Sequence, residues 1–384
     1  MRTITTTEDL ADYCALAKSQ PFVTLDTEFL RERTYWSKLC LIQMALPGAG
    51  EAVLIDPIEG PEMSLEPLYD LFRHEATVKV FHAARQDLEI FFVEGGVFPK
   101  PLFDTQVAAM VCGFGEQVGY ETLVKKIARA DLDKTSRFTD WSRRPLSEAQ
   151  KEYALADVTH LRVIYEWLAG QLKKNGRAEW VAEELAILTD PATYTVHPDE
   201  AWQRIKTRTT SGRFLGVVKA LARFREAYAQ SQNVPRSRVM KDDALLELAS
   251  TRPTTPEELG RSRLLLREGR KPEIAEGILA AVKEGLEMRP EEIPRVENGR
   301  EQLQVNPALA DLLRVLLKAK SESLGVAPRL IASSAELDQI AAGERNVPAL
   351  AGWRREAFGE DAVRLCKGEI ALSAKGNEVR VVPL

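Results

Sequence analysis

The chain has 384 residues, of which 45% are hydrophobic and 28% charged, a composition typical of a globular protein with room for two or three domains. No apolar run approaches the about 18 residues that a membrane span needs, and the N-terminus lacks the apolar core of a secretory signal. The four cysteines are scattered without a C-x-x-C pair, which argues against a disulfide framework or a zinc site. We therefore expect a cytoplasmic protein with reduced thiols and no membrane partner.

The net charge of −5 is an average over unlike parts of the chain. Residues 1–200 hold 21 Lys and Arg against 32 Asp and Glu, a net charge of −11. Residues 201–290 hold 18 against 11, a net charge of +7, and residues 291–384 hold 13 against 14. This asymmetry indicates that the acidic N-terminal half and the basic block have different tasks.

Short β-like runs and helical segments alternate in the first third of the chain. Three runs rich in β-branched and apolar residues predict an antiparallel meander: 21–28, 38–45 and 51–56. The segments after them predict a helix, a strand and a helix closed by two glycines: 65–74, 78–83 and 84–96. A meander followed by strand–helix alternation is typical of a mixed α/β sheet covered by helices.

From about residue 103 the pattern is helical. The clearest helix runs from Leu146 or Ser147 to Lys174, with a capping box formed by Ser147 and Gln150 and with Gly176 after its end. Residues 189–200 carry two prolines and few apolar side chains, so they are interpreted as a linker, and residues 290–299 as a second one.

The C-terminal half of the chain has a weak internal repeat with an offset of 92 residues. Residues 233–249 align with 325–341, and each copy follows an amphipathic helix, which indicates two related helical modules. Two strands around Gly376 predict a C-terminal hairpin. The predicted domains are therefore 1–195, 205–290 and 300–384.

Two carboxylates lie two residues apart in the first predicted strand. Asp26 and Glu28 leave the same face of an otherwise apolar strand, where they repel each other and are costly to bury. Either this end of the strand is exposed to water, or divalent cations neutralise the pair, since carboxylates are natural ligands of Mg²⁺ and Mn²⁺.

Further acids favour the second interpretation. Asp87 lies at the start of an amphipathic helix, where it could also be an ordinary first-turn aspartate. Tyr153 and Asp157 share one face of the capped helix, and that face also carries Leu161 and points inward. An inward aspartate needs a compensating partner, either a buried hydrogen bond or ion pair, or a metal ion.

These residues follow the order D-x-E, D and Y-x-x-x-D, and the chain resembles the ribonuclease D family of the DEDD exonuclease superfamily, in its tyrosine branch. The matching stretches are LDTEF (25–29), VFHAARQDLEIF (80–91), LFDTQVAA (102–109) and residues 133–161. Residues 210–287 resemble an HRDC domain, the helicase-and-RNase-D C-terminal module. The histidine branch would place His at the position of Glu152, which supports the tyrosine branch.

The resemblance implies a ribonuclease H-like α/β exonuclease domain, with a mixed sheet flanked by helices, followed by two small all-α HRDC-type domains. It also implies two divalent metal ions, Mg²⁺ or Mn²⁺, about 3.5–4 Å apart. Asp26 would bridge both ions, Glu28 and Asp157 would hold the first, and Asp87 the second. Tyr153 would orient the attacking water. The FDTQ aspartate, Asp104, matches a structural position of the family.

The substrate must be held by cations elsewhere in the chain. Candidates near the motifs are Arg85, Lys134, Trp141, Arg143 and Arg144, each of which could instead lie in a solvated loop. The basic block offers an RNA-binding surface that includes Arg213, Lys219, Arg223, Arg236, Arg238 and Lys241, although such a module could also be a helical spacer.

We therefore expect a metal-dependent 3′→5′ exoribonuclease that releases nucleoside 5′-monophosphates. By resemblance, its substrates would be tRNA precursors and other small structured RNAs with 3′ extensions, and the protein would be a monomer. Two alternatives stay open: a DNA 3′→5′ exonuclease, which would share the carboxylates, and a non-catalytic RNA-binding protein with a decayed nuclease site. The presence of all five site residues argues against decay.

Overall fold

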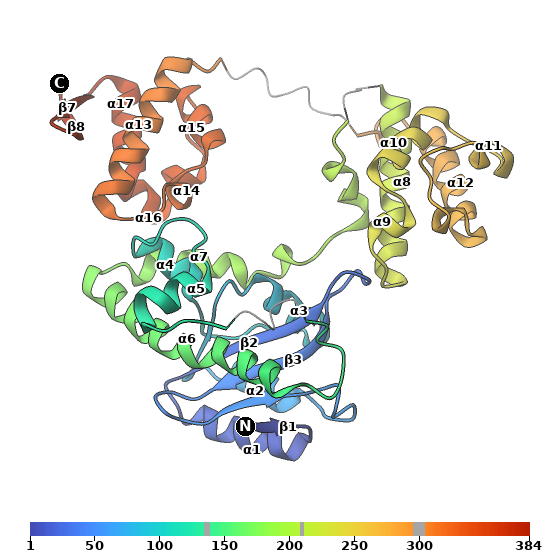
Figure 1. Ribbon diagram of the computed structural model, residues 1–384. Coiled ribbons are helices and arrows are strands. Elements are labelled where there is room, and N and C mark those ends of the chain that lie inside the picture. The colour runs from blue at the N-terminus through green and yellow to red at the C-terminus, as the bar shows by residue number, and fades with distance from the viewer. Residues whose placement is uncertain (134–138, 208–210, 295–303) are drawn as a thin grey trace. The chain divides into compact units, whose positions relative to one another are not determined.

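The computed structural model describes residues 1–133, 139–207, 211–294 and 304–384 (Figure 1). These residues form two compact units. One unit comprises residues 1–28, 40–190 and 300–384, and the other comprises residues 29–39 and 191–299. No helix of the described parts combines the length and the hydropathy needed to cross a membrane.

A six-stranded mixed sheet is the centre of the first unit. Its strands lie in the order β1-β4-β3-β2-β5-β6, with β3 antiparallel to β4 and the pairs β1–β4, β2–β5 and β5–β6 parallel. The bounds are β1 (Arg2–Ile4), β2 (Phe22–Leu30), β3 (Lys38–Ala45), β4 (Ala52–Ile55), β5 (Val78–Phe81) and β6 (Leu102–Asp104). The central strands read as continuous apolar runs because both faces of the sheet are covered.

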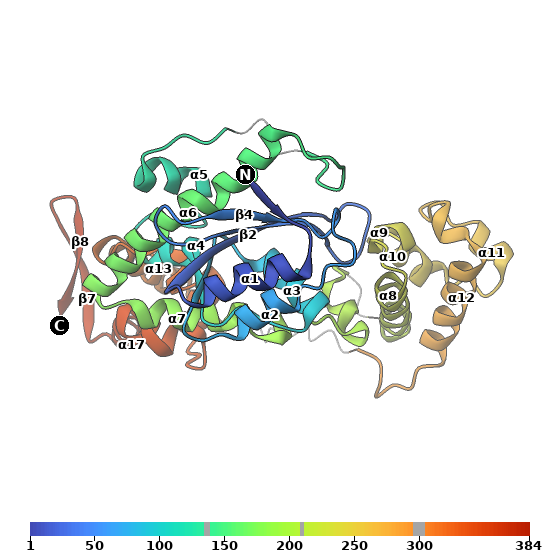
Figure 2. The ribbon, with the colours of Figure 1, turned by 90° about the horizontal axis from the view of Figure 1, so that it is seen from below.

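Helices lie on both faces of this sheet (Figure 2). One face carries α1 (Thr7–Lys18), α2 (Glu66–Arg73) and α3 (Arg85–Gly95), and the long helix α6 (Glu148–Asn175) crosses the other. Arg162 of α6 donates to the carbonyls of Gly48 and Gly50 at 2.7 and 2.9 Å, which ties the helix to the turn between β3 and β4.

Short helices complete the nuclease part of this unit. They are α4 (Thr105–Val111), α5 (Tyr120–Leu123), the π-helix η1 (Val124–Ala128) and α7 (Ala178–Leu188). Asp104 caps α4 through the backbone N–H groups of Gln106 and Val107, and it also accepts hydrogen bonds from the N–H groups of Ala83 and Ala84 just before α3. This side chain therefore aligns the starts of two helices, which agrees with a structural role.

The second unit is mainly helical. It contains η2 (Pro191–Thr193), η3 (Pro198–Arg204), α8 (Gly212–Ser231), α9 (Arg236–Val239), α10 (Asp242–Thr251), α11 (Pro256–Gly260), η4 (Glu268–Arg270) and α12 (Pro272–Glu287). Its apolar core is formed by α8, α10 and α12, together with Tyr35 from the segment between β2 and β3.

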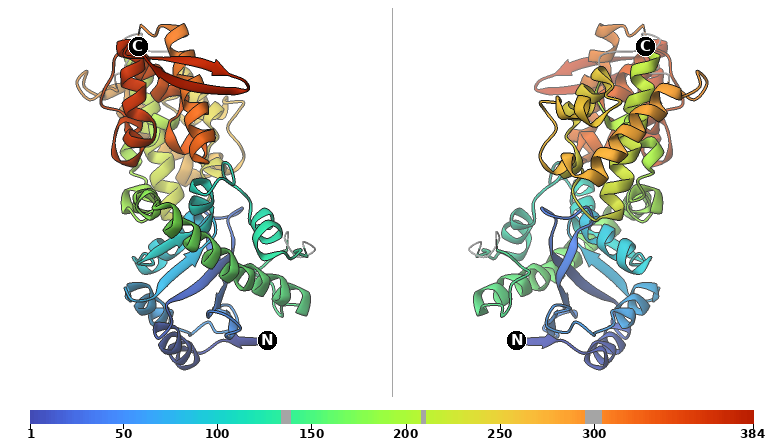
Figure 3. Two further views of the ribbon diagram at one scale, coloured as in Figure 1. Left: turned by 90° about the vertical axis from the view of Figure 1, so that its left-hand side faces the viewer. Right: turned by 90° about the vertical axis from the view of Figure 1, so that its right-hand side faces the viewer.

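A further helical bundle with a hairpin returns to the first unit. It consists of α13 (Pro307–Leu324), α14 (Pro328–Ile331), α15 (Ser334–Ala341), η5 (Pro348–Leu350), α16 (Gly352–Arg354), η6 (Arg355–Gly359), α17 (Glu360–Lys367), β7 (Ile370–Lys375) and β8 (Glu378–Pro383) (Figure 3). Trp353 stacks on Trp180 of α7 at 4.6 Å between ring centroids, and Arg354 pairs with Glu184. This bundle is therefore anchored on α7.

Most predicted elements are confirmed. The three strands, the helices around 65–74 and 84–96, the capping box at Ser147 and the hairpin around Gly376 are all present. Two short strands were missed, β1 and β6, because three residues carry too little periodicity to identify a strand.

Residues 189–200, predicted as a linker, contain the boundary between the two units at residues 190 and 191. Their two prolines begin the short helices η2 and η3, and Ala201 and Ile205, which follow this stretch, pack into the core of the second unit. Of the second predicted linker, residues 290–299, the part from 295 onward lies outside the described residues.

Candidate active site

Strand β2 carries the D-x-E pair at the edge of a fully buried stretch. Phe22, Val23 and Leu25 are buried, whereas Asp26 and Glu28 are half-buried near the end of the strand. The hydroxyl of Thr24 donates to the carbonyl of Val158 in α6 at 2.8 Å. This bond fixes the distance between the strand and the helix two residues before Asp26 and one residue after Asp157.

Helix α6 brings the fourth acid to the same place. Asp26, Glu28 and Asp157 each offer a carboxylate oxygen, and these three oxygens lie within 4.8 Å of one another. The turn of α6 that carries Asp157 is held by Tyr120 of α5, whose hydroxyl donates to the carbonyls of Asp157 at 2.6 Å and of Ala156 at 3.1 Å. Three residues predicted as metal ligands are thus brought together by two rigid elements.

Asp87 reaches the site from the first turn of α3. Its carboxylate is buried and accepts a short hydrogen bond from the hydroxyl of Thr27, which lies between Asp26 and Glu28 on β2. The start of α3 is positioned by Asp104, as described above. Strand β2 therefore contacts Asp87 through Thr27, on the face opposite to that of Asp26 and Glu28.

Burial raises the pKa values of Asp26, Glu28 and Asp87, and repulsion by neighbouring carboxylates adds to this effect. Burial raises the pKa of Glu28 to about 8, and the charges of Asp157 and Asp87 add to this effect. Burial, followed by the charges of Asp157, Asp87 and Glu28, raises the pKa of Asp26 well above its usual range. Burial also raises the pKa of Asp87 to about 7, although the Thr27 hydroxyl opposes the shift. Either bound protons or bound cations can relieve the repulsion within such a cluster of carboxylates.

Tyr153 lies one turn before Asp157 on α6. The ring of Trp141 lies beside it, with 6.1 Å between centroids and an interplanar angle of 31°. Trp141 is only 3% exposed, so it supports the tyrosine ring from the side and offers no open surface for a base.

The other predicted substrate contacts divide into two groups. Arg144 forms a buried bidentate ion pair with Asp56, with Nε–Oδ2 at 2.6 Å and a second contact at 2.7 Å, and this makes it part of the framework. Arg85 and Arg143 are exposed, and Arg143 pairs with Asp140 at the surface. Lys134 lies outside the described residues.

The predicted basic surface of the second unit is also partly used internally. Arg236 pairs with the buried Glu226, and Arg223 pairs with Glu284. Lys219 donates to a backbone carbonyl, and the remaining members of the set are exposed on the surface: Arg213, Arg238 and Lys241.

Sequence reasoning missed three hydroxyls around the acids. Thr24, Thr27 and Tyr120 hold the helix and strand that carry the carboxylates. Thr24 lies two residues before the D-x-E pair and Thr27 is its middle residue. They were the nearest signal, but a threonine in a β-strand is so common that its position alone does not indicate a role.

The comparisons with known proteins agree with this geometry. The profile of a family described as 3′-5′ exonuclease matches residues 1–173, and that of the HRDC domain matches residues 214–282. The chain is 64% identical over 383 residues to a ribonuclease D of Jannaschia sp. (strain CCS1), covering 99% of each chain, and 48% identical to a ribonuclease D of Granulibacter bethesdensis, covering 99% of this chain and 96% of the relative.

A solved structure with 28% identity is also similar. It is Escherichia coli RNase D, described as an exoribonuclease involved in structured RNA processing, with a TM-score of 0.83, and the match covers 96% of this chain and 98% of that one.

The fold and the acidic cluster define a 3′→5′ exonuclease domain followed by an HRDC domain. The chain belongs to the ribonuclease D family. It is thus a metal-dependent 3′→5′ exoribonuclease, and the expected fold class is confirmed for the nuclease domain and for one HRDC domain.

Proposed function

We propose that Asp26, Glu28, Asp87, Tyr153 and Asp157 form the catalytic site and that two divalent ions, Mg²⁺ or Mn²⁺, bind there. The observation that carries this proposal is the meeting of three carboxylate oxygens within 4.8 Å, with Asp87 close enough for its charge to raise the pKa of both Asp26 and Glu28. Oxygen ligands of this kind fit hard divalent cations, which would relieve the repulsion among the acids.

The roles that we propose for the individual side chains are those implied by the resemblance to the ribonuclease D family. Asp26 would be shared by both ions, with Glu28 and Asp157 on one side and Asp87 on the other. The bound ions supply an activated water and stabilise the departing 3′-oxygen of the scissile bond. Tyr153, supported by Trp141, would orient that water from the turn of α6 before Asp157. The hydroxyls of Thr24 and Tyr120 keep Asp157 at its distance from β2.

The proposed substrates are tRNA precursors and other small structured RNAs with 3′ extensions. The role of the E. coli relative in structured RNA processing supports this proposal. The phosphate backbone would be held by the exposed Arg85 and Arg143 and by the exposed basic residues of the HRDC domain, without base readout. We propose a monomer that acts in the cytoplasm, with residues 300–384 as a second, divergent HRDC-like domain.

The test is the shortening of a 5′-labelled RNA in Mg²⁺ or Mn²⁺. Asp157→Asn removes one carboxylate charge at nearly constant volume, and we expect it to lower the rate by at least about 100-fold. The matched control is Glu152→Gln, an exposed acid on the same helix, which should leave the rate unchanged. If Asp157→Asn cleaved as fast as the wild type, the assigned site would be wrong. Rates on matched RNA and DNA overhangs separate the two substrate classes.

A further inference from the structure

The segment between β2 and β3 belongs to the helical unit. The chain leaves the first unit directly after Glu28 and returns to it at Cys40. Strand β2, which presents Asp26 and Glu28, therefore runs without interruption into a segment whose packing partners lie in the HRDC-containing unit. Residues 31–37 have no regular secondary structure, so their own backbone does not fix their position.

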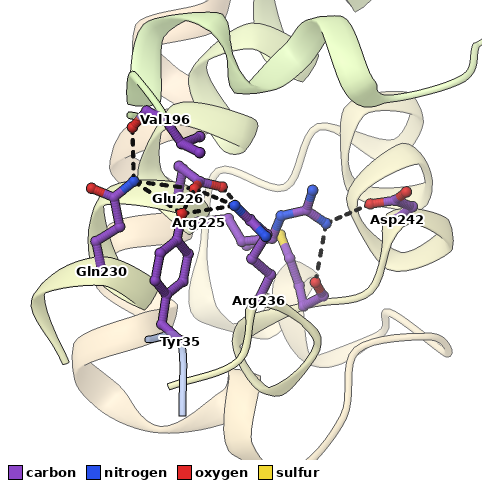
Figure 4. A network of polar contacts seen from close by, with 8 residues as sticks. Tyr35, Val196, Arg225, Glu226, Gln230, Arg236 and Asp242 are labelled. Carbon is purple, nitrogen blue, oxygen red and sulfur yellow. Dashed lines mark hydrogen bonds and ion pairs between the residues drawn. The ribbon is translucent and has the colours of Figure 1, made fainter. Parts of the chain in front are cut away.

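Tyr35 fixes this segment through its hydroxyl (Figure 4). The hydroxyl donates to the carboxylate of Glu226 in α8 and accepts hydrogen bonds from Arg236 at 2.7 Å and from the amide of Gln230 at 3.2 Å. The guanidinium of Arg236 also lies over the tyrosine ring, 4.7 Å from its centroid. One phenol thus meets three side chains of the helical unit.

Asn233 holds the same segment by its backbone. Its side-chain oxygen accepts hydrogen bonds from the N–H groups of Tyr35 at 3.1 Å and of Trp36 at 3.0 Å. Asn233 has φ of 48°, in the left-handed region that Asn tolerates and Gly prefers. The segment is therefore anchored twice, by independent groups.

In the network around Tyr35, the buried carboxylate of Glu226 is paired with the guanidinium of Arg236. Glu226 is 1% exposed, and Arg236 binds both of its carboxylate oxygens. Burial favours the neutral acid, but hydrogen bonds from Arg236 and Tyr35 outweigh it and hold the pKa of Glu226 below its usual value. Burial and the hydrogen bond to Glu226 raise the pKa of Tyr35 to about 12, so the phenol stays a donor. Removing one bond leaves the others in place.

We propose that Tyr35 and Asn233 are positioning residues for the catalytic strand, through which the HRDC-containing unit holds the end of β2 and so the geometry of the metal ligands Asp26 and Glu28. This inference rests on the proposed metal site. It assigns to the HRDC unit a second task besides contact with RNA: part of the nuclease framework is anchored on it.

The first test uses Tyr35→Phe in the full chain, with Mn²⁺ as the probe. The variant keeps the ring and the Glu226–Arg236 pair but loses the hydroxyl. We expect the Mn²⁺ concentration for half-maximal RNA cleavage to rise by about tenfold, the lower end of the range for groups that position metal ligands. The KM for RNA should stay unchanged and saturating Mn²⁺ should restore kcat. Amide hydrogen exchange over residues 29–39 should become faster.

The matched control is Tyr228→Phe, which removes a hydroxyl from α8, the helix that carries Glu226. Among the described residues this hydroxyl contacts Glu273 alone, at 3.5 Å. A structural role alone would lower the melting temperature and leave the Mn²⁺ dependence equal to that of the control. That result would overturn the proposal.

Asn233→Gly tests the same positioning role through the backbone contacts of the segment. It keeps the positive φ, removes the oxygen that holds the Tyr35 and Trp36 amides, and should shift the Mn²⁺ dependence in the same direction. If neither variant shifts it, the anchoring role is wrong although the metal site stands. If the wild type itself shows no Mn²⁺ or Mg²⁺ dependence, the proposed metal site fails instead.

Discussion

At the scale of single residues, the acids at the end of β2 are held together against their mutual repulsion. Without bound cations, Glu28 and Asp87 have pKa values of about 8 and 7, and that of Asp26 is also raised. The folded protein therefore retains protons that the unfolded chain releases near pH 4. Stability from these groups is present at low pH and is lost as the pH rises toward 8.

Asp157→Asn tests directly whether the stability of the metal-free protein falls as the pH rises. The substitution removes a charge that raises the pKa of both Glu28 and Asp26, so the metal-free variant should lose less stability as the pH rises. At pH 8 in a chelator, we expect its free energy of unfolding to exceed that of the wild type by about 1–2 kcal/mol. At pH 5 the two proteins should differ less. Urea denaturation at both pH values measures this.

The control for that experiment is excess Mg²⁺ at pH 8. Cations should stabilise the wild type through its carboxylates and stabilise the variant much less, which reverses the order. A stability difference that does not change with pH would show that charge repulsion is not its origin.

The sequence could identify some site residues better than others. The two-residue spacing of Asp26 and Glu28 and the four-residue spacing of Tyr153 and Asp157 follow from the periods of strand and helix, so their shared faces could be predicted. That these faces meet is a property of the folded chain. Arg144 was misleading for the same reason: its partner Asp56 lies 88 residues earlier, and no local pattern indicates it.

At the scale of elements, the entry into α6 depends on that ion pair. Asp56 is 1% exposed and also accepts hydrogen bonds from the N–H groups of Ile58 and Glu59. Arg144 further donates to the carbonyls of Cys40 and Trp141. The pair therefore fastens the segment before α6, which carries Trp141, to the end of β4 and the middle of the sheet.

Removing only one member of the Asp56–Arg144 ion pair should destabilise the fold. Arg144→Leu leaves a buried, unpaired carboxylate, and we expect the free energy of unfolding to fall by roughly 3–5 kcal/mol. The double variant Asp56→Asn/Arg144→Leu keeps an acceptor for Ile58 and Glu59 without the charge, so it should recover about half of that loss or more. Urea denaturation of the three proteins gives the comparison. If the double variant is no more stable than Arg144→Leu, the unpaired charge is not the cause.

The helical repeat shows how far element order follows from the sequence. The offset of 92 residues places the four-residue helix α9 on α14, residue for residue, and the starts of α10 and α15 also correspond. Leu245 and Leu337, which this offset places opposite each other, are both buried. The later parts of the two bundles diverge: α12 has 16 residues, whereas the corresponding residues 364–379 hold the end of α17 and the strand β7.

At the scale of the whole molecule, the net charge of −5 is the sum of an acidic nuclease half, residues 1–200, and a basic block, residues 201–290. Acids gather where cations would bind, and the basic block is the HRDC region. The sequence count nevertheless overstates the positive surface, because Arg223, Arg225 and Arg236 are paired with Glu284, Asp242 and Glu226. Which cations are used internally depends on tertiary contacts and could not be derived from the count.

Salt dependence of RNA binding distinguishes the exposed cations from the paired ones. Each phosphate contact to single-stranded RNA that is lost should reduce the slope of log K against log salt by about 0.7. In an Asp157→Asn background, which prevents cleavage, the triple variant Arg213→Ala/Arg238→Ala/Lys241→Ala should therefore lower the slope by about 2. Arg223→Ala should change it little, because Glu284 already neutralises that guanidinium. Fluorescence anisotropy with a 3′-extended RNA at four or more salt concentrations gives both slopes. Equal slopes for the parent and the triple variant would place the RNA contacts outside this surface, whereas a large effect of Arg223→Ala alone would mean that RNA displaces the ion pair.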